Sequence, residues 1–191
     1  MNINKYYAHA IRLSNFDVID FSILEKILKS GYLLSRNRQL EIDASDYWMS
    51  YYCSGYNGMD YISLCDLAVE RSYYSSFNMY IARGLSMLIN RSIPTIKPTL
   101  LETSMKNKYS MCELGNRKER YTDLVDEVQV YDNIPLTYLN GLCISLSMFY
   151  CYHDNNYLNK YLKLIEYLLE RYHYKVNVYN LDNGNVLKKI K

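Results

Sequence analysis

The stretch Glu127-Val-Gln-Val-Tyr-Asp-Asn-Ile-Pro135 is the part of the sequence that says most about the fold. Its valines alternate with Gln129, which is typical of a strand with one buried face. Asn133-Ile-Pro135 ends the alternation, because proline cannot donate a ladder hydrogen bond. The stretch therefore predicts a strand that begins at the carboxylate of Glu127.

Further strands are predicted on both sides of this stretch. Asp60-Tyr-Ile-Ser-Leu-Cys65 is rich in β-forming residues and is bounded by a glycine on one side, and Leu85-Ser-Met-Leu-Ile-Asn90 follows Gly84. Leu142-Cys-Ile-Ser-Leu146 fits either a strand or a buried turn. The segments 175–181 and 185–190 flank Asp182-Asn183-Gly184, and Asn-Gly supplies the positive φ angles of a type I′ turn. We therefore expect short strands and a C-terminal hairpin.

Two segments have the period of amphipathic helices. From Asp20 the apolar residues recur on one helical face up to Gly31, which predicts the end of a helix. Ser22 and Glu25 within it have the spacing of a capping box. The segment 156–174 gives the longest helical pattern, with leucines on one face and lysines and glutamates opposite.

Two stretches have no regular period. Residues 32–58 are polar and aromatic and predict a loop with some helix, whereas residues 94–120 contain two prolines and predict a mobile basic loop. No repeat, linker or low-complexity tract marks a second domain. Strands and helices without a βαβ order predict one α+β domain over residues 1–191, with a split, mostly antiparallel sheet and flanking helices.

Composition excludes several classes of protein. The 191 residues include 22 Lys or Arg and 20 Asp or Glu, and a formal net charge of +2 gives no indication of binding through a phosphate backbone. The uncharged run Leu142–Tyr152 is well short of the ~20 residues that cross a bilayer. The first residues lack the basic and apolar segments of a signal peptide. We expect a soluble chain without a membrane partner.

Phosphate-binding and metal-binding motifs are missing from the sequence. The seven glycines form neither G-x-G-x-x-G nor G-x-x-x-x-G-K, which argues against Rossmann and P-loop enzymes. The five cysteines include no C-x-x-C pair, and no histidine lies three or four residues from another histidine or a cysteine. We expect reduced thiols and no structural metal. The 23 tyrosines accompany abundant Asn, Ile and Lys, so most of their rings are expected to pack in the core and its boundary.

Four pieces of sequence occur in an order that is typical of one superfamily. Tyr7-Ala-His9-Ala10 is followed by Ile27-Leu-Lys-Ser-Gly31-Tyr-Leu-Leu-Ser35, by Gly58-Met-Asp-Tyr61-Ile-Ser-Leu64 and by Glu127–Pro135. The series resembles the ADP-ribosyltransferases, in particular the His-Tyr-Glu branch of diphtheria-toxin-like and poly(ADP-ribose) polymerase-like enzymes. The ending E-V-x-V-x-x-x-I-P is also similar to that of the DNA-targeting DarT toxins. The resemblance covers about residues 6–138.

The resemblance implies an ADP-ribosyltransferase-like fold and the transfer of ADP-ribose from NAD to a macromolecular acceptor, with release of nicotinamide. Glu127 would be the catalytic carboxylate, since positive charge develops on the ribose as the glycosidic bond breaks. His9 would bond the ribose of NAD. One ring among Tyr61, Tyr73 and Tyr74 would stack on the nicotinamide. NAD is then a substrate, and a protein acceptor is favoured over nucleic acid.

Each assigned residue also has an ordinary structural interpretation. Glu127 could be a solvated residue at a strand start with Asp123 and Asp126 nearby, and His9 and the tyrosines could be packing residues. The sequence departs from the arginine-specific branch, because Ile62-Ser-Leu64 is not an S-T-S strand and no second glutamate stands two residues after Glu127. The acceptor therefore stays unassigned.

Two other functions stay open at this point. One is a catalytically inactive interaction module that uses the basic stretch from Lys106 to Arg120 against an acidic partner. The other is a phosphotransferase that moves an RNA 2′-phosphate onto NAD, for which Arg12, Arg36 and Arg38 are candidate contacts. The expected location is the cytoplasm, or a target cell into which the protein is delivered as a toxin or effector.

Overall fold

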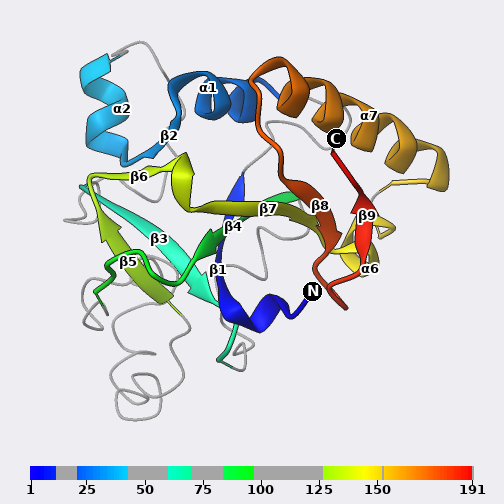
Figure 1. Cartoon of the computed structure of the whole chain (residues 1–191), viewed down its shortest axis with the longest axis horizontal. Coiled ribbons are helices and arrows are strands. Elements are labelled where there is room, and N and C mark those ends of the chain that lie inside the picture. Colours follow the sequence, from blue (N-terminus) through cyan, green and yellow to red (C-terminus); the bar gives the residue numbers. More distant parts are fainter. Residues whose placement is uncertain (12–20, 43–59, 70–83, 97–126, 152, 191) are drawn as a thin grey trace, which may run out of the picture.

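The computed structural model describes residues 1–11, 21–42, 60–69, 84–96, 127–151 and 153–190, without the side chains of Glu127 and Asn155. In these ranges seven strands form one sheet in the order β5-β3-β1-β4-β7-β8-β9 (Figure 1). Neighbouring strands are antiparallel except for β7 and β8, which are parallel. The strands are β1 (Tyr6–Ile11), β3 (Tyr61–Asp66), β4 (Leu85–Asn90), β5 (Glu127–Tyr131), β7 (Leu139–Ile144), β8 (Asn177–Asn180) and β9 (Val186–Lys188).

Two further strands form a small second sheet. β2 (Tyr32–Leu34) pairs with β6 (Asn133–Pro135) in antiparallel register. The mixed α+β class and the mostly antiparallel sheet predicted from the sequence are therefore confirmed. Residues 133–135 differ from the prediction, because they leave the large sheet and form a strand of their own beside β2.

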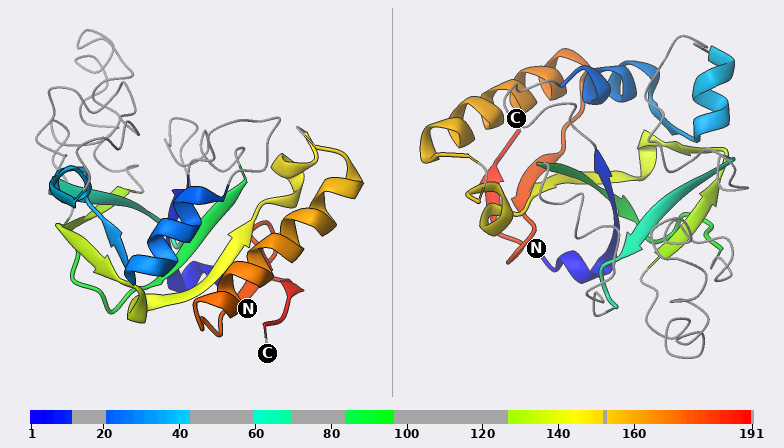
Figure 2. Two further views of the ribbon diagram at one scale, coloured as in Figure 1. Left: turned by 90° about the horizontal axis from the view of Figure 1, so that it is seen from above. Right: turned by 180° about the vertical axis from the view of Figure 1, so that it is seen from behind.

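The helices gather mainly on one side of the large sheet, where α1 and α7 lie side by side (Figures 1 and 2). They enclose the main hydrophobic core with the sheet, and Leu24, Ile165 and Leu142 are fully buried there. No helix in the described ranges is long and apolar enough to span a membrane. The helical elements are α1 (Ser22–Ser30), α2 (Arg36–Ile42), α6 (Leu146–Phe149), α7 (Asn155–Arg171) and the 3-10 turns η1 (Ile3–Lys5) and η3 (Leu136–Tyr138).

Helix α1 ends where the sequence predicts, but it begins differently. Gly31 has φ 77°, and its N–H donates to the carbonyl of Ile27 as a left-handed C-cap. The predicted capping box is wrong, because Phe21 occupies the N-cap without a side-chain cap bond. Glu25 instead accepts hydrogen bonds from Arg171 and Tyr172 at the end of α7. The carboxylate joins the two helices rather than capping its own.

The predicted C-terminal hairpin is confirmed in β8 and β9, but its turn is wider than type I′. Among the described residues of this turn, the positive φ is found at Gly184, with φ 75°, and not at Asn183. Asp182 accepts hydrogen bonds from the hydroxyl of Ser145 and the N–H of Ser147 at the start of α6. The turn therefore opens to bring Asp182 to α6, which a two-residue turn could not do.

The sheet opens between β1 and β3. β1 pairs with β4 over its whole length, whereas its register with β3 consists of Tyr7 opposite Asp66 and Ala8 opposite Cys65. β3 in turn pairs with β5 from Tyr61 to Cys65. Figure 1 shows β3 and β5 spreading away from β1 toward α2. We call this pair of strands the β3–β5 ribbon, because it leaves the sheet as a unit.

Candidate functional site

His9 lies on β1 at the point where β3 diverges. Its Nδ1 is 2.9 Å from the carbonyl oxygen of Ser63 in β3. A carbonyl can only accept, so Nδ1 carries the hydrogen and Nε2 of the neutral ring is an acceptor. Burial lowers the pKa of His9, and the bond to Ser63 offsets this in part. The imidazole is therefore neutral at pH 7, with Nε2 as its hydrogen-bond acceptor.

Glu127 begins β5, as the sequence predicts. Its backbone is in register with Cys65 of β3, and Cys65 is in register with Ala8, the neighbour of His9. Strands in a sheet are about 4.8 Å apart, so the backbone of Glu127 lies roughly 10 Å from β1. The side chain of Glu127 is outside the described part of the structure. Three strands thus bring the backbones of two sequence-predicted site residues to one level of the sheet. Because Glu127 shares its register with Ala8, the alternation of a strand assigns positions 127 and 9 to opposite faces of the sheet.

Tyr61 begins β3 and stands opposite Tyr131 of β5. The two ring centroids are 5.4 Å apart at an interplanar angle of 68°, an edge-to-face contact. Its neighbour Ile62 is buried in the main core, and because side chains alternate along a strand, Tyr61 points to the other face of the ribbon. The structure brings the Tyr61 ring to Tyr131 rather than to His9. Tyr73 and Tyr74 lie outside the described residues.

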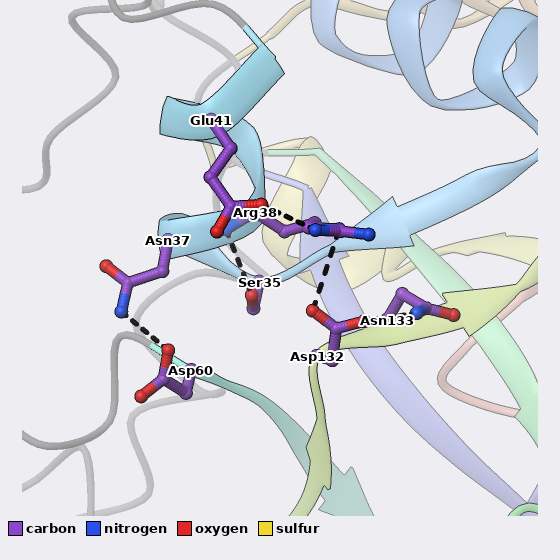
Figure 3. A network of polar contacts seen from close by, with 7 residues as sticks. All are labelled: Ser35, Asn37, Arg38, Glu41, Asp60, Asp132 and Asn133. Carbon is purple, nitrogen blue, oxygen red and sulfur yellow. Dashed lines mark hydrogen bonds and ion pairs between the residues drawn. The ribbon is translucent and has the colours of Figure 1, made fainter.

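A network of polar contacts surrounds the outer end of the β3–β5 ribbon (Figure 3). Its backbone centre is Asp132, which links β5 to β6 with φ 64°. The Asp132 N–H donates to the carbonyl of Asp60 at 2.7 Å, and its own carbonyl accepts from the N–H of Ser35 at 2.8 Å. Aspartate tolerates this left-handed conformation better than most residues. One residue therefore turns the chain from the large sheet into the small one.

Side chains add further contacts to this network. Asn37 Nδ2 donates to Asp60 Oδ1 at 2.5 Å. Arg38 bonds Glu41 at 2.5 Å, and its Nε lies 3.8 Å from Asp132 Oδ1. The hydrogen bond to Glu41 and the charges of Glu41 and Asp132 raise the pKa of Arg38. We call this group the polar corner, which consists of Ser35, Asn37, Arg38, Glu41, Asp60, Asp132 and Asn133.

The polar corner changes the interpretation of the basic residues singled out from the sequence. Arg38 is engaged by two carboxylates rather than left to bind an anion, and Arg36 is half-buried at the start of α2. Arg12 and the stretch from Lys106 to Arg120 are outside the described residues. Sequence reasoning missed Asn37, Asp60 and Asp132, because their partners are distant in the chain. The signal for Asp60 and Asp132 was their position at the start of one predicted strand and just after the other.

The described residues around the opening offer a hydrogen-bond acceptor but no cluster of metal ligands. In the described ranges no cluster of three or more His, Cys, Asp or Glu side chains could hold a metal ion. His9 offers a neutral acceptor at the opening between β1 and the ribbon. Comparisons with protein-family models, with curated proteins and with solved structures found no match to this chain.

Proposed function

We propose that this chain is an ADP-ribosyltransferase-like enzyme that transfers ADP-ribose from NAD to a macromolecular acceptor. The observation that supports the proposal is the strand order. β1, β3 and β5 are neighbours in the sheet, and they carry His9, Tyr61 and Glu127, the residues that the sequence resemblance singles out. These pieces are far apart in the chain, so their adjacency is not a consequence of sequence proximity.

In the proposed reaction, the bond between the anomeric carbon of the ribose and the nicotinamide nitrogen breaks. Its electron pair leaves with nicotinamide, and a nucleophile of the acceptor bonds to the same carbon and loses its proton. His9 Nε2 accepts a hydrogen bond from a ribose hydroxyl, which orients the sugar. This role needs the neutral imidazole, which the partial burial of His9 favours and the hydrogen bond to the Ser63 carbonyl opposes only in part.

Glu127 stabilises the positive charge that develops on the ribose ring. A fixed carboxylate interacts more strongly with this charge in the transition state than with the neutral sugar of bound NAD. Glu127 therefore increases turnover and has little effect on the affinity for NAD. Nicotinamide stacks on a tyrosine ring, with Tyr61, Tyr73 and Tyr74 as the candidates.

The test is the substitution Glu127→Gln, which removes the charge and keeps the size of the side chain. We expect NAD affinity close to that of the wild type and turnover lower by ~10²-fold or more, because the lost interaction is strongest in the transition state. Nicotinamide release from labelled NAD would be followed, with label transfer to protein, DNA and RNA fractions measured separately. The fraction that takes up label identifies the acceptor.

A matched control is Glu166→Gln on α7. Glu166 bonds Lys188 of β9 at 2.8 Å, on the opposite side of the sheet order from β5. We expect this variant to turn over like the wild type. Equal turnover by the wild type and Glu127→Gln would reject Glu127 as the catalytic residue. If the wild type releases no nicotinamide with any fraction, the proposed function is wrong.

A further inference from the structure

The β3–β5 ribbon is joined to β1 at one end and diverges from it at the other. The register of β1 with β3 consists of the two pairs at Tyr7 and Ala8. Beyond Ala8 the sheet ladder no longer determines how far β3 stands from β1. In the proposed function this distance matters, because His9 is on β1 whereas Tyr61 and Glu127 are on the ribbon.

Apolar packing alone does not define the position of the ribbon. Ile62, Leu64, Val128 and Val130 are buried in the main core and hold the ribbon against it. The hydrophobic effect is non-directional, so it favours burial without selecting one position to within a fraction of an ångström. Hydrogen bonds have the required directionality.

Directional contacts hold the ribbon at several places, which include the Arg91–Asp66 ion pair at the end of β3 and the backbone bonds between Ile96 and Gln129 of β5. Two further contacts lie along the diverging part of β3. The inner contact is the bond from His9 to the Ser63 carbonyl. The outer contact is the polar corner, where Asn37 of α2 donates to Asp60 and the backbone of Asp132 bonds both Asp60 and Ser35. Asp60 stands three residues before Ser63, so the two contacts are about 10 Å apart along β3. The paired strands β3 and β5 connect the two contacts.

We propose that the polar corner is a positioning device that sets the β3–β5 ribbon relative to His9, with Asn37 and Asp60 as the positioning residues. The catalytic consequence rests on the proposed function. Asn37 lies on α2, directly after β2, and Asp60 directly precedes β3. Their bond connects the ribbon to the part of the molecule that also contains α1 and the small sheet. The corner contacts no substrate in this proposal and acts through the strands.

The test uses an exchange of the two side chains. Asn37→Asp places a second carboxylate against that of Asp60 and removes the Nδ2 donor, so the contact becomes repulsive. The double variant Asn37→Asp/Asp60→Asn restores a hydrogen bond, because the amide at position 60 now donates to the carboxylate at position 37. Asn37→Ala removes the donor without adding a repulsive charge. It replaces Asn37→Asp in the test if that variant does not fold. Glu166→Gln is the control for loss of a carboxylate elsewhere.

Two readouts separate positioning from mere stability. The first is the NMR signal of the His9 Nδ1 proton, which reports the bond to Ser63 in the folded chain and does not require any activity. The second is kcat and KM for NAD. For Asn37→Asp we expect a shifted His9 signal and a kcat/KM for NAD about 10-fold lower, a size typical of one lost hydrogen bond. The exchange variant should restore the wild-type signal of the His9 Nδ1 proton. Its kcat/KM for NAD should be within about 2-fold of the wild-type value.

A lower melting temperature in Asn37→Asp or Asn37→Ala, with the His9 signal and kcat/KM unchanged, would overturn the positioning role. Failure of the exchange variant to restore the His9 signal would also overturn it. A His9 signal that shifts and is restored, in a chain whose wild type releases no nicotinamide, would reject the proposed function and leave the structural coupling of the corner to His9 supported. The two proposals therefore fail in distinguishable ways.

Discussion

Tyr161 is a buried polar residue for which the structure shows no compensating bond. The residue is 2% exposed, and its hydroxyl has no hydrogen-bond partner among the described residues. The ring contacts Phe21 and Phe149 edge-on at centroid distances of 4.7 Å and 5.3 Å. Burial raises the pKa of Tyr161, so the hydroxyl stays protonated. The ring contributes packing, whereas the hydroxyl carries a desolvation cost.

Replacing this hydroxyl should stabilise the protein. We expect Tyr161→Phe to raise the free energy of unfolding by about 1 kcal/mol, because an unsatisfied buried polar group costs about that much or more and the ring contacts are kept. Urea unfolding followed by circular dichroism would measure the change. Tyr167→Phe, at a side chain that is 56% exposed, should leave stability unaltered. A less stable Tyr161→Phe would show that the hydroxyl has a partner in solution.

The contacts of His9 and Tyr61 could not be predicted from the sequence. His9 was singled out from the order of sequence pieces, and the structure places it on β1. Its bond to the Ser63 carbonyl could not be predicted, because every residue has a backbone carbonyl and the sequence gives no sign of which one is in reach. The same holds for Tyr61, whose contact with Tyr131 depends on the register of β3 with β5.

Local sequence signals predicted that a helix or strand forms, but they did not predict which strands pair with one another. Gly31 ended α1 as expected, because a residue without Cβ adopts the left-handed C-cap without strain. The strand at 127–131 was evident from its alternation. The short strand β6 was not predicted, since three residues are too few for a periodicity. Its partner β2 lies about 100 residues earlier in the chain.

An ion pair connects three strands at the other end of the sheet opening. Arg91, just after β4, bonds both oxygens of Asp66 at the end of β3, at 2.6 Å and 2.7 Å. β1 lies between these two strands, and the Arg91 guanidinium stands 4.7 Å from the centroid of the Tyr7 ring of β1. The side chain of Asp66 is 11% exposed, so its carboxylate depends on this partner.

Removing the arginine should therefore destabilise the sheet. We expect Arg91→Gln to lower the free energy of unfolding by about 2 kcal/mol, below the 3–5 kcal/mol typical of a fully buried pair because the Arg91 side chain is 34% exposed. The double variant Asp66→Asn/Arg91→Gln should lose less than the two single variants together, since it leaves no isolated charge. Chemical unfolding of all four proteins gives the coupling. Strictly additive losses would mean that the pair is not coupled in solution.

At the scale of the whole molecule, the sequence predicted the class of fold but not the order of the strands. Alternation shows which residues of a strand share a face, yet it carries no information about which strand lies beside it. Here β1 is flanked by β3 and β4, and β7 by β4 and β8, so sheet neighbours come from distant parts of the chain. The candidate site depends on this order, because it is what brings β1, β3 and β5 together.

The free energy of unfolding should depend on pH through the partly buried His9. Burial lowers its pKa in the folded state below the usual 6.5, so between these two values the unfolded chain binds more protons than the folded chain. The free energy of unfolding then rises with pH in this window. The contribution is fully present above pH 6.5 and is lost as the pH falls from 6.5 toward the folded-state pKa. Ser63 opposes the shift without reversing it.

His9→Asn isolates this effect from the other titrating groups. An asparagine amide can donate to the Ser63 carbonyl in place of Nδ1, and it does not titrate. We expect the wild type to lose more stability than His9→Asn when the pH is lowered from 7 to 5, because only the wild type must protonate this residue on unfolding. Urea unfolding at a series of pH values measures both curves, and the remaining histidines and carboxylates cancel in their difference. Parallel curves would mean that His9 titrates alike in the folded and unfolded chains, and the neutral acceptor that the proposed NAD contact requires would lose its physical basis.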